Sequence, residues 1–313
     1  MKYYITILIV LVLGIGAIGF LSGWFDQQTN VQTATSTPAT ATPDSLLPDE
    51  DTDTATTTNA EDSQSDDNVE VIGNSADGRQ IQAYHFGNGD DEILFVAGIH
   101  GGYEWNTAKL AYRMVDWFRT NSNAIPDNLE VTVIPVLNPD GLHSIVGTST
   151  GNFTQTDVPG RGETIPGRFN ANGVDLNRNF ACNWQPQGTW QDRQVDAGSS
   201  AFSEPESQAL RDYVRANTPT AAVVYYSAAG GVYTSSCNSD PLAQTTSMMN
   251  TYANASGYPA AGEFDAYEIN GDAVDWMATQ NIPGISVLLS NHTDVEWSKN
   301  KAGMQSILQQ FAQ

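Results

Sequence analysis

One histidine and one glutamate stand where an apolar run gives way to an amphipathic one, in the stretch FVAGIHGGYEWNTAKLAY, residues 95–112. His100 and Glu104 offer an imidazole nitrogen and a carboxylate oxygen, which are donor types that metal ions take in proteins. Two interpretations follow: a metal site, or an ordinary strand-to-helix turn that buries a histidine. For an isolated histidine the turn would be the better interpretation, so the other motifs of the chain decide between them.

The segments that must position these residues alternate between strand and helix patterns. Short apolar runs predict strands, and amphipathic runs with a period near 3.6 predict helices. The alternation indicates one α/β domain, with a mixed, largely parallel sheet and helices on both faces. In such sheets ligand sites lie at the carboxyl ends of strands, where His100 falls. The predicted strands are residues 80–86, 92–98, 129–137, 221–227 and 284–290, and the predicted helices are residues 104–120, 203–217 and 304–311.

A long segment from Asn138 to Ser203 shows no sustained helical or strand pattern, yet it is rich in Gly, Asn, Arg, Trp and Pro. Segments of this length without regular structure are usually functional or disordered. This one contains aromatic residues, a cysteine and several arginines. We therefore predict a functional segment that contributes side chains to a site.

The first 68 residues differ in composition from the rest. No charged residue occurs from Tyr3 to Phe25, a run long enough to cross a bilayer as a helix, so residues 1–25 predict a signal anchor with Lys2 on the cytoplasmic side. A cleaved secretory signal is the alternative. Residues 26–68 are acidic and rich in Thr, Ala and Pro, which predicts a disordered linker before a folded domain over residues 69–313. Either interpretation places that domain outside the cytoplasm, membrane-anchored or secreted.

Charge and cysteine usage narrow the partners further. The formal charge of −23 includes ten acidic residues in the linker and one positive charge at Lys2, which leaves −14 for the folded domain. A domain this anionic repels nucleic acid and anionic lipid headgroups, so we expect contact with the membrane only through the N-terminal helix. The two cysteines, Cys182 and Cys237, predict a disulfide in an oxidising compartment.

Five motifs in one order carry a family resemblance. GIHGGYEW is followed by NPDG (Asn138–Gly141), GRFNANGVDLNRNF (Gly167–Phe180), YEINGDAVDW (Tyr267–Trp276) and LLSNHTDVEW. Together they resemble the zinc carboxypeptidases of the carboxypeptidase A type, especially the compact bacterial members. The resemblance spans residues 69–313 and implies a zinc carboxypeptidase-like fold with zinc as cofactor.

The resemblance implies roles for six residues. His100 and Glu104 correspond to the first two zinc ligands, and Arg168 corresponds to the cation that stabilises the oxyanion formed in catalysis. The alternative for an arginine in an acidic protein is a surface ion pair.

The remaining implied roles concern substrate binding. Asn177 and Arg178 correspond to the pair that holds the terminal carboxylate of a substrate, because a planar guanidinium suits a carboxylate. Tyr267 corresponds to a mobile tyrosine that covers the substrate, with core packing as an equal alternative. Asp272 falls next to the side-chain pocket that the resemblance implies, where it is a candidate to contact a positively charged substrate group.

Three departures from the family pattern stand out. The first motif has one residue more between His100 and Glu104 than the family's HxxE. Tyr226 stands where the family has its third zinc ligand, a histidine, and Leu288 stands where it has its catalytic glutamate. His292, Glu296 and His143 are conceivable substitutes, although each one alone is better explained as a surface residue.

The function that these features predict is an exported, membrane-tethered zinc metallocarboxypeptidase that removes C-terminal residues from peptides or from peptidoglycan peptides. Two alternatives stay open. The first is a binding protein of the same fold that keeps the carboxylate clamp, Arg178 and Asn177. The changes at Tyr226 and Leu288 suggest that such a protein is catalytically impaired. The second is a zinc-dependent amide deacylase with the same ligand pattern.

Overall fold

The computed structural model describes residues 68–313. The predicted membrane helix over residues 1–25 and, except for Asn68, the predicted linker over residues 26–68 lie outside these described residues. Among the residues that the structure does describe, no helix is both long and apolar enough to cross a membrane. The first strand begins at Val69.

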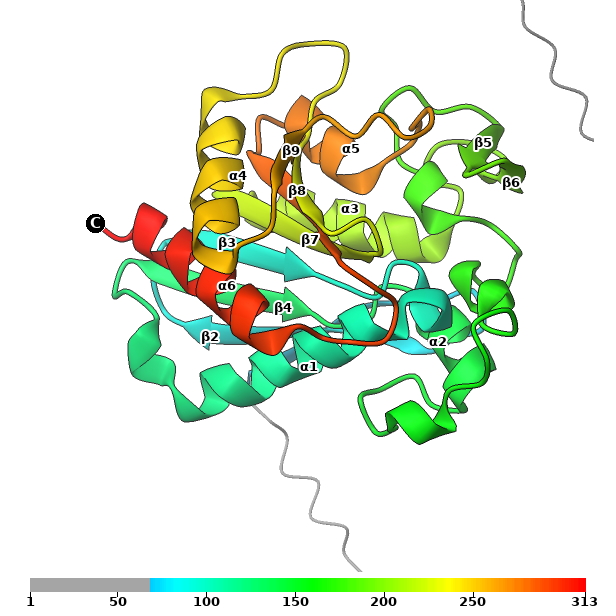
Figure 1. Ribbon diagram of the computed structural model, residues 1–313, viewed down its shortest axis with the longest axis horizontal. Coiled ribbons are helices and arrows are strands. Elements are labelled where there is room, and N and C mark those ends of the chain that lie inside the picture. Colours follow the sequence, from blue (N-terminus) through cyan, green and yellow to red (C-terminus); the bar gives the residue numbers. More distant parts are fainter. Residues whose placement is uncertain (1–67) are drawn as a thin grey trace, which may run out of the picture. The chain divides into compact units, whose positions relative to one another are not determined.

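A mixed sheet of eight strands forms the centre of the fold (Figure 1). The four central strands β4, β3, β7 and β10 run parallel, whereas β1, β2 and β8 are antiparallel to their inner neighbours, and the short β9 pairs with β8 in parallel. In spatial order the strands are β1 (Val69–Asn74), β2 (Gln80–Gly87), β4 (Leu129–Ile134), β3 (Asp91–Val96), β7 (Ala221–Ser227), β10 (Gly284–Leu289), β8 (Gly231–Thr234) and β9 (Ala260–Gly262).

Helices cover both faces of this sheet. One face packs against α1 (Trp105–Thr120), α4 (Ala243–Ser256) and α6 (Trp297–Phe311). The other packs against α3 (Pro205–Asn217) and α5 (Ala273–Thr279), and a short helix, α2 (Pro139–Val146), follows β4. The α/β fold expected from the sequence is therefore present, with helices on both faces of a sheet that is parallel in its centre.

Strand β7 shows why its sequence is apolar throughout. Its alternate residues Ala221, Val223 and Tyr225 join the core under α1, α4 and α6, while Val224 and Tyr226 join the opposite core. Because both faces are covered, neither set of side chains can be polar without a buried partner. This alternation directs the side chain of Tyr226 toward α3 and α5.

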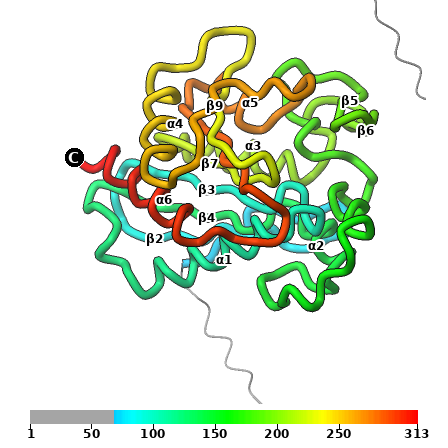
Figure 2. The backbone as a smooth tube through the Cα atoms, viewed as in Figure 1, coloured from blue at the N-terminus to red at the C-terminus, as the bar shows by residue number. Residues whose placement is uncertain are grey.

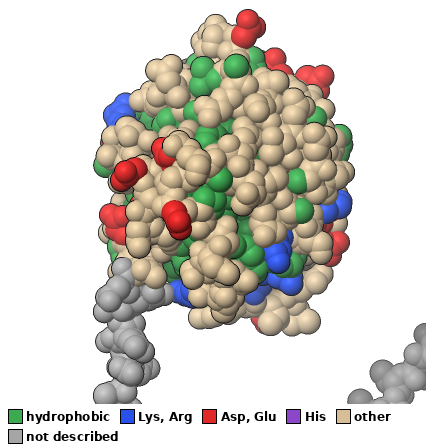
Figure 3. All heavy atoms as spheres, turned by 90° about the vertical axis from the view of Figure 1, so that its left-hand side faces the viewer, with side chains coloured by type: hydrophobic (Ala, Val, Ile, Leu, Met, Phe, Trp, Pro, Cys, Tyr) green, Lys and Arg blue, Asp and Glu red, His purple; other side chains and the backbone are tan. Residues whose placement is uncertain are grey.

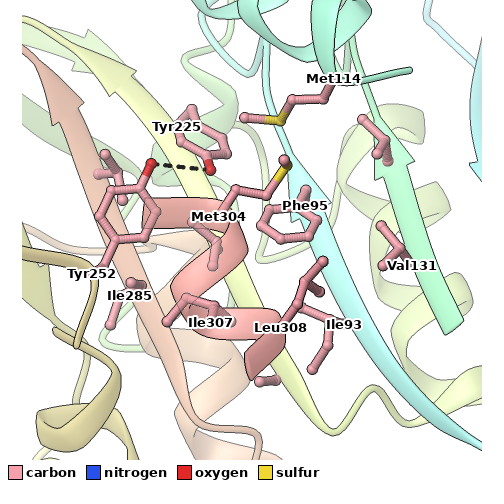
Figure 4. Packing of buried hydrophobic residues seen from close by; sticks show 14 of the residues in the cluster. Ile93, Phe95, Met114, Val131, Tyr225, Tyr252, Ile285, Met304, Ile307 and Leu308 are labelled. Carbon is pink, nitrogen blue, oxygen red and sulfur yellow. Dashed lines mark hydrogen bonds between the residues drawn. The ribbon is translucent and has the colours of Figure 1, made fainter. Parts of the chain in front are cut away.

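Helix α6 shows how the first core closes (Figure 4). Met304, Ile307 and Leu308 lie on one side of the helix and point toward the sheet, where Phe95 of β3 meets them. This is the helical face that the sequence predicted for residues 304–311, although the helix begins earlier, at Trp297. Burial of such side chains is the main favourable contribution to folding, and it fixes the height of the helix over the strands.

The parallel strands end at one common edge, and the segment of residues 138–203 gathers there (Figures 1 and 2). The segment is less irregular than its sequence predicts, because it contains α2, several 3-10 turns and a hairpin of β5 (Gln187–Trp190) and β6 (Arg193–Asp196). These elements are too short to show a period. Helix α2, for example, is set by its ends: the Asn138 side chain accepts from Gly141 N, and Gly147 closes it in the left-handed region.

The face turned to the viewer in Figure 3 carries charged side chains of both signs among polar and hydrophobic ones. No single sign dominates this view. The net negative charge of the domain is therefore not expressed as one acidic patch on this face.

A disulfide joins Cys182 and Cys237, as the sequence predicts. It connects the segment after the GVDLNRNF motif with the loop after β8, and the sulfur of Cys182 lies within the core beneath α3 and α5. The bond closes a loop of 55 residues, which includes all of α3 and β7.

Removal of this disulfide should cost considerable stability, because the bond restricts the unfolded chain. Loop entropy for a separation of 55 residues gives about 4 kcal/mol. We expect the Cys182→Ala/Cys237→Ala variant to lose stability of that order in urea unfolding. Reducing agent should lower the stability of the natural chain to a similar degree and leave the variant unchanged; equal stability of both proteins without reducing agent would contradict the prediction.

Candidate active site

His100 follows β3 and opens a 3-10 turn that ends at Glu104, where α1 begins. Glu104 therefore lies at the junction of turn and helix rather than inside the predicted helix. The additional residue between the two side chains is accommodated by Gly101, which has a φ of +42°. A Cβ at Gly101 would lie 2.7 Å from the backbone of both Gly141 and Gly167, so only glycine fits this close approach.

The imidazole of His100 lies between two carboxylates. Its Nδ1 is 3.0 Å from Glu104 Oε1 and its Nε2 is 3.4 Å from Asp175 Oδ1. Both ring nitrogens and Glu104 Oε2 are buried and form no hydrogen bond with another described residue. His100 is 4 % exposed and Glu104 is 2 % exposed. Unpartnered buried groups of this kind are rare and indicate a ligand or ion that completes them.

Asp175 is the hub of the site, and sequence analysis assigned it no role. It caps the 3-10 turn Leu176–Arg178. The Nε of Arg168 donates a hydrogen bond to its Oδ2 at 2.8 Å, and Nη2 of Arg168 forms an ion pair with the same oxygen at 2.8 Å. Burial alone would raise the pKa of Asp175, but the Arg168 guanidinium and the neighbouring His100 outweigh it and hold that pKa well below its usual range. A clue was present in the sequence, since the residue stands in the same GVDLNRNF motif as Asn177.

Glu104 also stays ionised. Burial acts to raise the pKa of Glu104, but the interactions with His100 and Arg168 outweigh it, so the net shift is downward. The Arg168 Nη1 atom lies 4.0 Å from Glu104 Oε1. The site therefore combines two buried carboxylates with a guanidinium that both of them share.

Arg178 is buried without a counter-ion. Its guanidinium donates to the carbonyl oxygen of Thr189 from Nε at 3.1 Å and from Nη2 at 2.7 Å, and to the carbonyl of Asn177 from Nη1 at 2.6 Å. Its side chain is among the most fully buried of the described residues, at 1 % exposure. None of the ion pairs formed by the described residues includes it.

Asn177 is held from both sides. Its Nδ2 donates to Asp272 Oδ2 at 2.7 Å, while its Oδ1 accepts from Tyr226 Oη at 3.1 Å and from the backbone of Ala273. The second oxygen of Asp272 caps α5 by accepting from Val274 N. Both carboxylate oxygens of Asp272 are thus engaged within the protein, which leaves this residue poorly suited to the contact with a cationic substrate that its sequence position suggested.

Tyr226 and Leu288 are register partners on the adjacent parallel strands β7 and β10. The Tyr226 ring lies 5.7 Å from the His100 ring, and Leu288 packs against the same core. Burial and the nearby Asp272 carboxylate raise the pKa of Tyr226 well above its ordinary value, so it remains a neutral phenol. The two departures from the family pattern therefore form one wall beside His100.

Three aromatic side chains, Tyr103, Trp190 and Tyr267, cover the arginines and are called the aromatic cover below. The Arg168 guanidinium lies 4.5 Å from the Trp190 ring, which meets the Tyr103 ring edge-on at 5.0 Å. The Arg178 guanidinium lies 5.9 Å from the Tyr267 ring. Of these three residues only Tyr267 was predicted from the sequence, because Trp190 reaches the site on a hairpin too short to be predicted.

Of the three conceivable substitutes, only His292 lies near the site. Its ring meets Tyr103 at 5.0 Å and its Nε2 accepts from Arg161. Burial lowers the pKa of His292 to about 4, so its ring is neutral at pH 7. Glu296 is engaged in hydrogen bonds at the start of α6, and His143 lies on α2 beside another arginine.

The side chains at the three positions expected to hold zinc can be compared with the ligands that zinc takes. His100 Nδ1 and Glu104 Oε2 are buried, unpartnered and of the right chemical type for two ligands. Tyr226 at the third position bonds to Asn177 instead, and residues 68–313 contain no group of three His, Cys, Asp or Glu side chains placed to hold a metal ion. The residues present therefore match zinc at two positions and do not complete its site.

The protein thus combines a mixed α/β sheet with a histidine–glutamate pair and buried arginines at the carboxyl edge of the sheet. Residues 57–306 match the family model of the zinc carboxypeptidases, and the chain belongs to this family. Zinc is the cofactor of the family, and its members are hydrolases.

Several known proteins resemble the chain. The gamma-D-glutamyl-L-diamino acid endopeptidase 1 of Lysinibacillus sphaericus is 23% identical over 71% of this chain and 60% of its own length. The bacteriocin BCN5 of Clostridium perfringens is 34% identical over 46% of this chain but only 15% of its own. The chain thus spans less than two thirds of these relatives.

Solved structures show the same fold. The carboxypeptidase A of Helicoverpa armigera superposes with a TM-score of 0.60 at 19% identity, over 77% of this chain and 66% of that one. The murein-tripeptide amidase MpaA of Escherichia coli O157 superposes with a TM-score of 0.53 at 21% identity, over 77% of this chain and 91% of that one.

Substitution of Tyr226 by histidine should strengthen zinc binding, because it places an imidazole beside His100, whose ring lies 5.7 Å from that of Tyr226. We expect Tyr226→His to bind zinc at least roughly tenfold more tightly than the natural chain does. A tenfold change is the lower end of what a residue that only hydrogen-bonds to a metal ligand contributes to metal affinity. Competition with a chromophoric zinc chelator measures it. Tyr226→Phe is the matched control, since it loses the same bond to Asn177; equal affinity of both variants would refute the prediction.

The carboxyl of Asp275 should make stability depend on pH. Burial and then the Asp272 carboxylate raise the pKa of Asp275 from 3.8 to about 8. Between these values the folded state holds a proton that the unfolded state has lost, so the free energy of unfolding falls as pH rises through this window.

The Asp275→Asn variant isolates this contribution. As pH rises from 5 to 8.5, the natural chain should lose stability that the variant keeps. The difference in the free energy of unfolding between the variant and the natural chain should therefore grow by an amount on the order of a few kcal/mol. Urea unfolding of both proteins at the two pH values measures the difference. A difference that is the same at both pH values would show that Asp275 ionises normally.

Proposed function

We propose that the protein recognises the C-terminal carboxylate of a peptide or peptidoglycan peptide, held by Arg178 and Asn177 beside Arg168. The observation that carries this proposal is the buried guanidinium of Arg178, which has no carboxylate partner among the described residues. A buried charge is costly unless an opposite charge meets it. A ligand carboxylate supplies that charge.

The surroundings of Arg178 favour a carboxylate over other anions. Its three hydrogen bonds to backbone carbonyls fix the plane of the guanidinium, and a planar fork matches the two oxygens of a carboxylate. Gly188 allows the hairpin backbone to lie directly against the side chain, since a Cβ there would come within 2.5 Å of Arg178 Cδ. Tyr267 lies over the guanidinium and separates it from solvent.

Each remaining group has a part in this recognition. Asp175 fixes Arg168 and stands beside His100, so the cation nearest to the carboxylate clamp cannot swing away. The aromatic cover excludes water from the guanidinium groups, which strengthens their attraction for an anion. Tyr226 fixes Asn177 from the side opposite to Asp272.

Hydrolysis of the terminal peptide bond, as a zinc metallocarboxypeptidase, is the second candidate. The unpartnered atoms of His100 and Glu104 favour it, as does membership of a family of hydrolases. The names of the murein-tripeptide amidase and of the diamino acid endopeptidase suggest a cell-wall peptide as substrate. Tyr226 and Leu288 weigh against turnover, because neither side chain is a zinc ligand or a base in the form that the structure holds. Export and membrane attachment through residues 1–25 belong to this proposal as well.

Both candidate functions require that the protein binds the free C-terminus of a peptide, so a peptide-binding measurement tests them together. We expect a peptide with a free C-terminus to bind the full-length protein roughly 10- to 100-fold more tightly than its amidated form, the value of charge-assisted hydrogen bonds. The Arg178→Gln variant should lose this preference, and Arg178→Lys should keep part of it. Calorimetric titration measures the affinities, and mass spectrometry of the peptides reports any cleavage.

Arg215→Gln, which removes an exposed positive charge on α3, is the matched control and should behave like the natural chain. Thermal unfolding shows whether each variant is folded. Equal affinity of the natural chain for free and amidated peptides would exclude carboxylate recognition. Binding without cleavage supports the first candidate, and removal of the last residue supports the second.

A further inference from the structure

A second arginine stands beside the site without a counter-ion. The Arg161 guanidinium lies 3.8 Å from the centroid of the Tyr103 ring, and the Arg168 guanidinium lies 5.8 Å from the same centroid. The two cations are therefore separated by no more than the sum of these distances. Arg168 is neutralised by Asp175, whereas no described residue forms an ion pair with Arg161.

The Arg161 side chain is held in place by three neighbours. Its Nη1 donates to Thr164 Oγ1 at 3.1 Å, its Nη2 contacts His292 Nε2, and its plane lies over Tyr103. The hydroxyl of Thr164 in turn donates to the backbone carbonyl of Arg161 at 2.9 Å. A guanidinium fixed in this way loses little further freedom when it binds an anion.

Arg161 is also open to solvent, unlike Arg168 and Arg178. A positive charge held near the rim of a site, in a domain of net charge −14, is available to an anion that enters from outside. Glu163, two residues along, is exposed and forms no ion pair with Arg161. The arrangement therefore points outward, to a group that the protein does not supply.

We propose that Arg161, fixed by His292 and Tyr103, is a subsite for a second carboxylate of the bound peptide, so that the preferred ligands are acidic peptides. The inference rests on the proposed recognition of a terminal carboxylate and names the class of peptide. The terminal carboxylate meets Arg178, and a carboxylate from an upstream residue meets Arg161. His292 is a positioning residue here, because its Nε2 holds the guanidinium.

Four peptides of one length test this subsite on the full-length protein. They carry Glu or Gln upstream of the last residue, each with a free or an amidated C-terminus. We expect the natural chain to bind the Glu peptides about threefold to tenfold more tightly than the Gln peptides at low salt, the range of a partly exposed charge pair. The preference should shrink in 0.5 M NaCl because salt screens exposed charges.

The variants assign the preference to one side chain. Arg161→Gln should bind Glu and Gln peptides alike, with the affinity of the natural chain for the Gln peptides; Arg161→Lys should keep a preference of the same sign. Arg215→Gln controls for net charge and should preserve the full preference. Thermal unfolding of each variant verifies folding.

The outcomes distinguish this inference from the proposed function. Equal binding of Glu and Gln peptides by the natural chain, or an unchanged preference in Arg161→Gln, overturns the subsite even if amidation weakens binding. A Glu preference that persists in amidated peptides, with no effect of amidation itself, supports the subsite and overturns the clamp at Arg178. Failure of all four peptides to bind overturns both.

Discussion

The site depends on one buried ion pair, between Asp175 and Arg168. Both side chains are almost completely buried, and two nitrogens of the guanidinium lie 2.8 Å from a single carboxylate oxygen, one of them as a hydrogen-bond donor. The second oxygen of Asp175 lies beside His100 and also accepts from the backbone of Asn177, at 3.1 Å. Buried pairs of this kind add little to stability compared with an apolar replacement, but loss of one partner is severe. Here the pair fixes the position of His100 relative to Asn177 and Arg178, the residues proposed to bind the carboxylate.

Strands and helices with many residues in a clear period could be predicted from the sequence, and the site motifs at their ends with them. The central strands and helices α1, α3 and α6 are of this kind, so the carboxyl edge of the sheet, where His100 lies, could be predicted with them. Arg168, Asn177 and Arg178 lie in the segment without a period, and only the family resemblance of their motif indicated them. Short elements could not be predicted. Strands β8 and β9 and the hairpin that carries Trp190 have four residues or fewer, which show no period and are defined by their neighbours.

The hydrogen-bond and ion-pair partners of the buried polar groups could not be predicted from the sequence either. Nothing in the order of residues shows that Asp175 takes both Arg168 and His100, or that Asp272 is used up by Asn177 and the start of α5. The changes at Tyr226 and Leu288 were visible one at a time. Only the sheet register shows that they are neighbours on β7 and β10, where an aromatic ring and an aliphatic chain replace polar groups side by side. A change at one of these positions alters the packing that the other experiences, so their effects are not expected to add.

The aromatic cover has a kinetic consequence. Arg168 and Arg178 are each exposed by 2 % or less, and Trp190 and Tyr103 by less than 6 %. A ligand can reach the Arg178 guanidinium only after the Tyr267 ring that lies over it moves aside, so diffusion does not set the rate at which the complex forms. Stopped-flow traces should then level off as peptide concentration rises, at the frequency with which Tyr267 moves away, and the same barrier should give a captured peptide a long residence time.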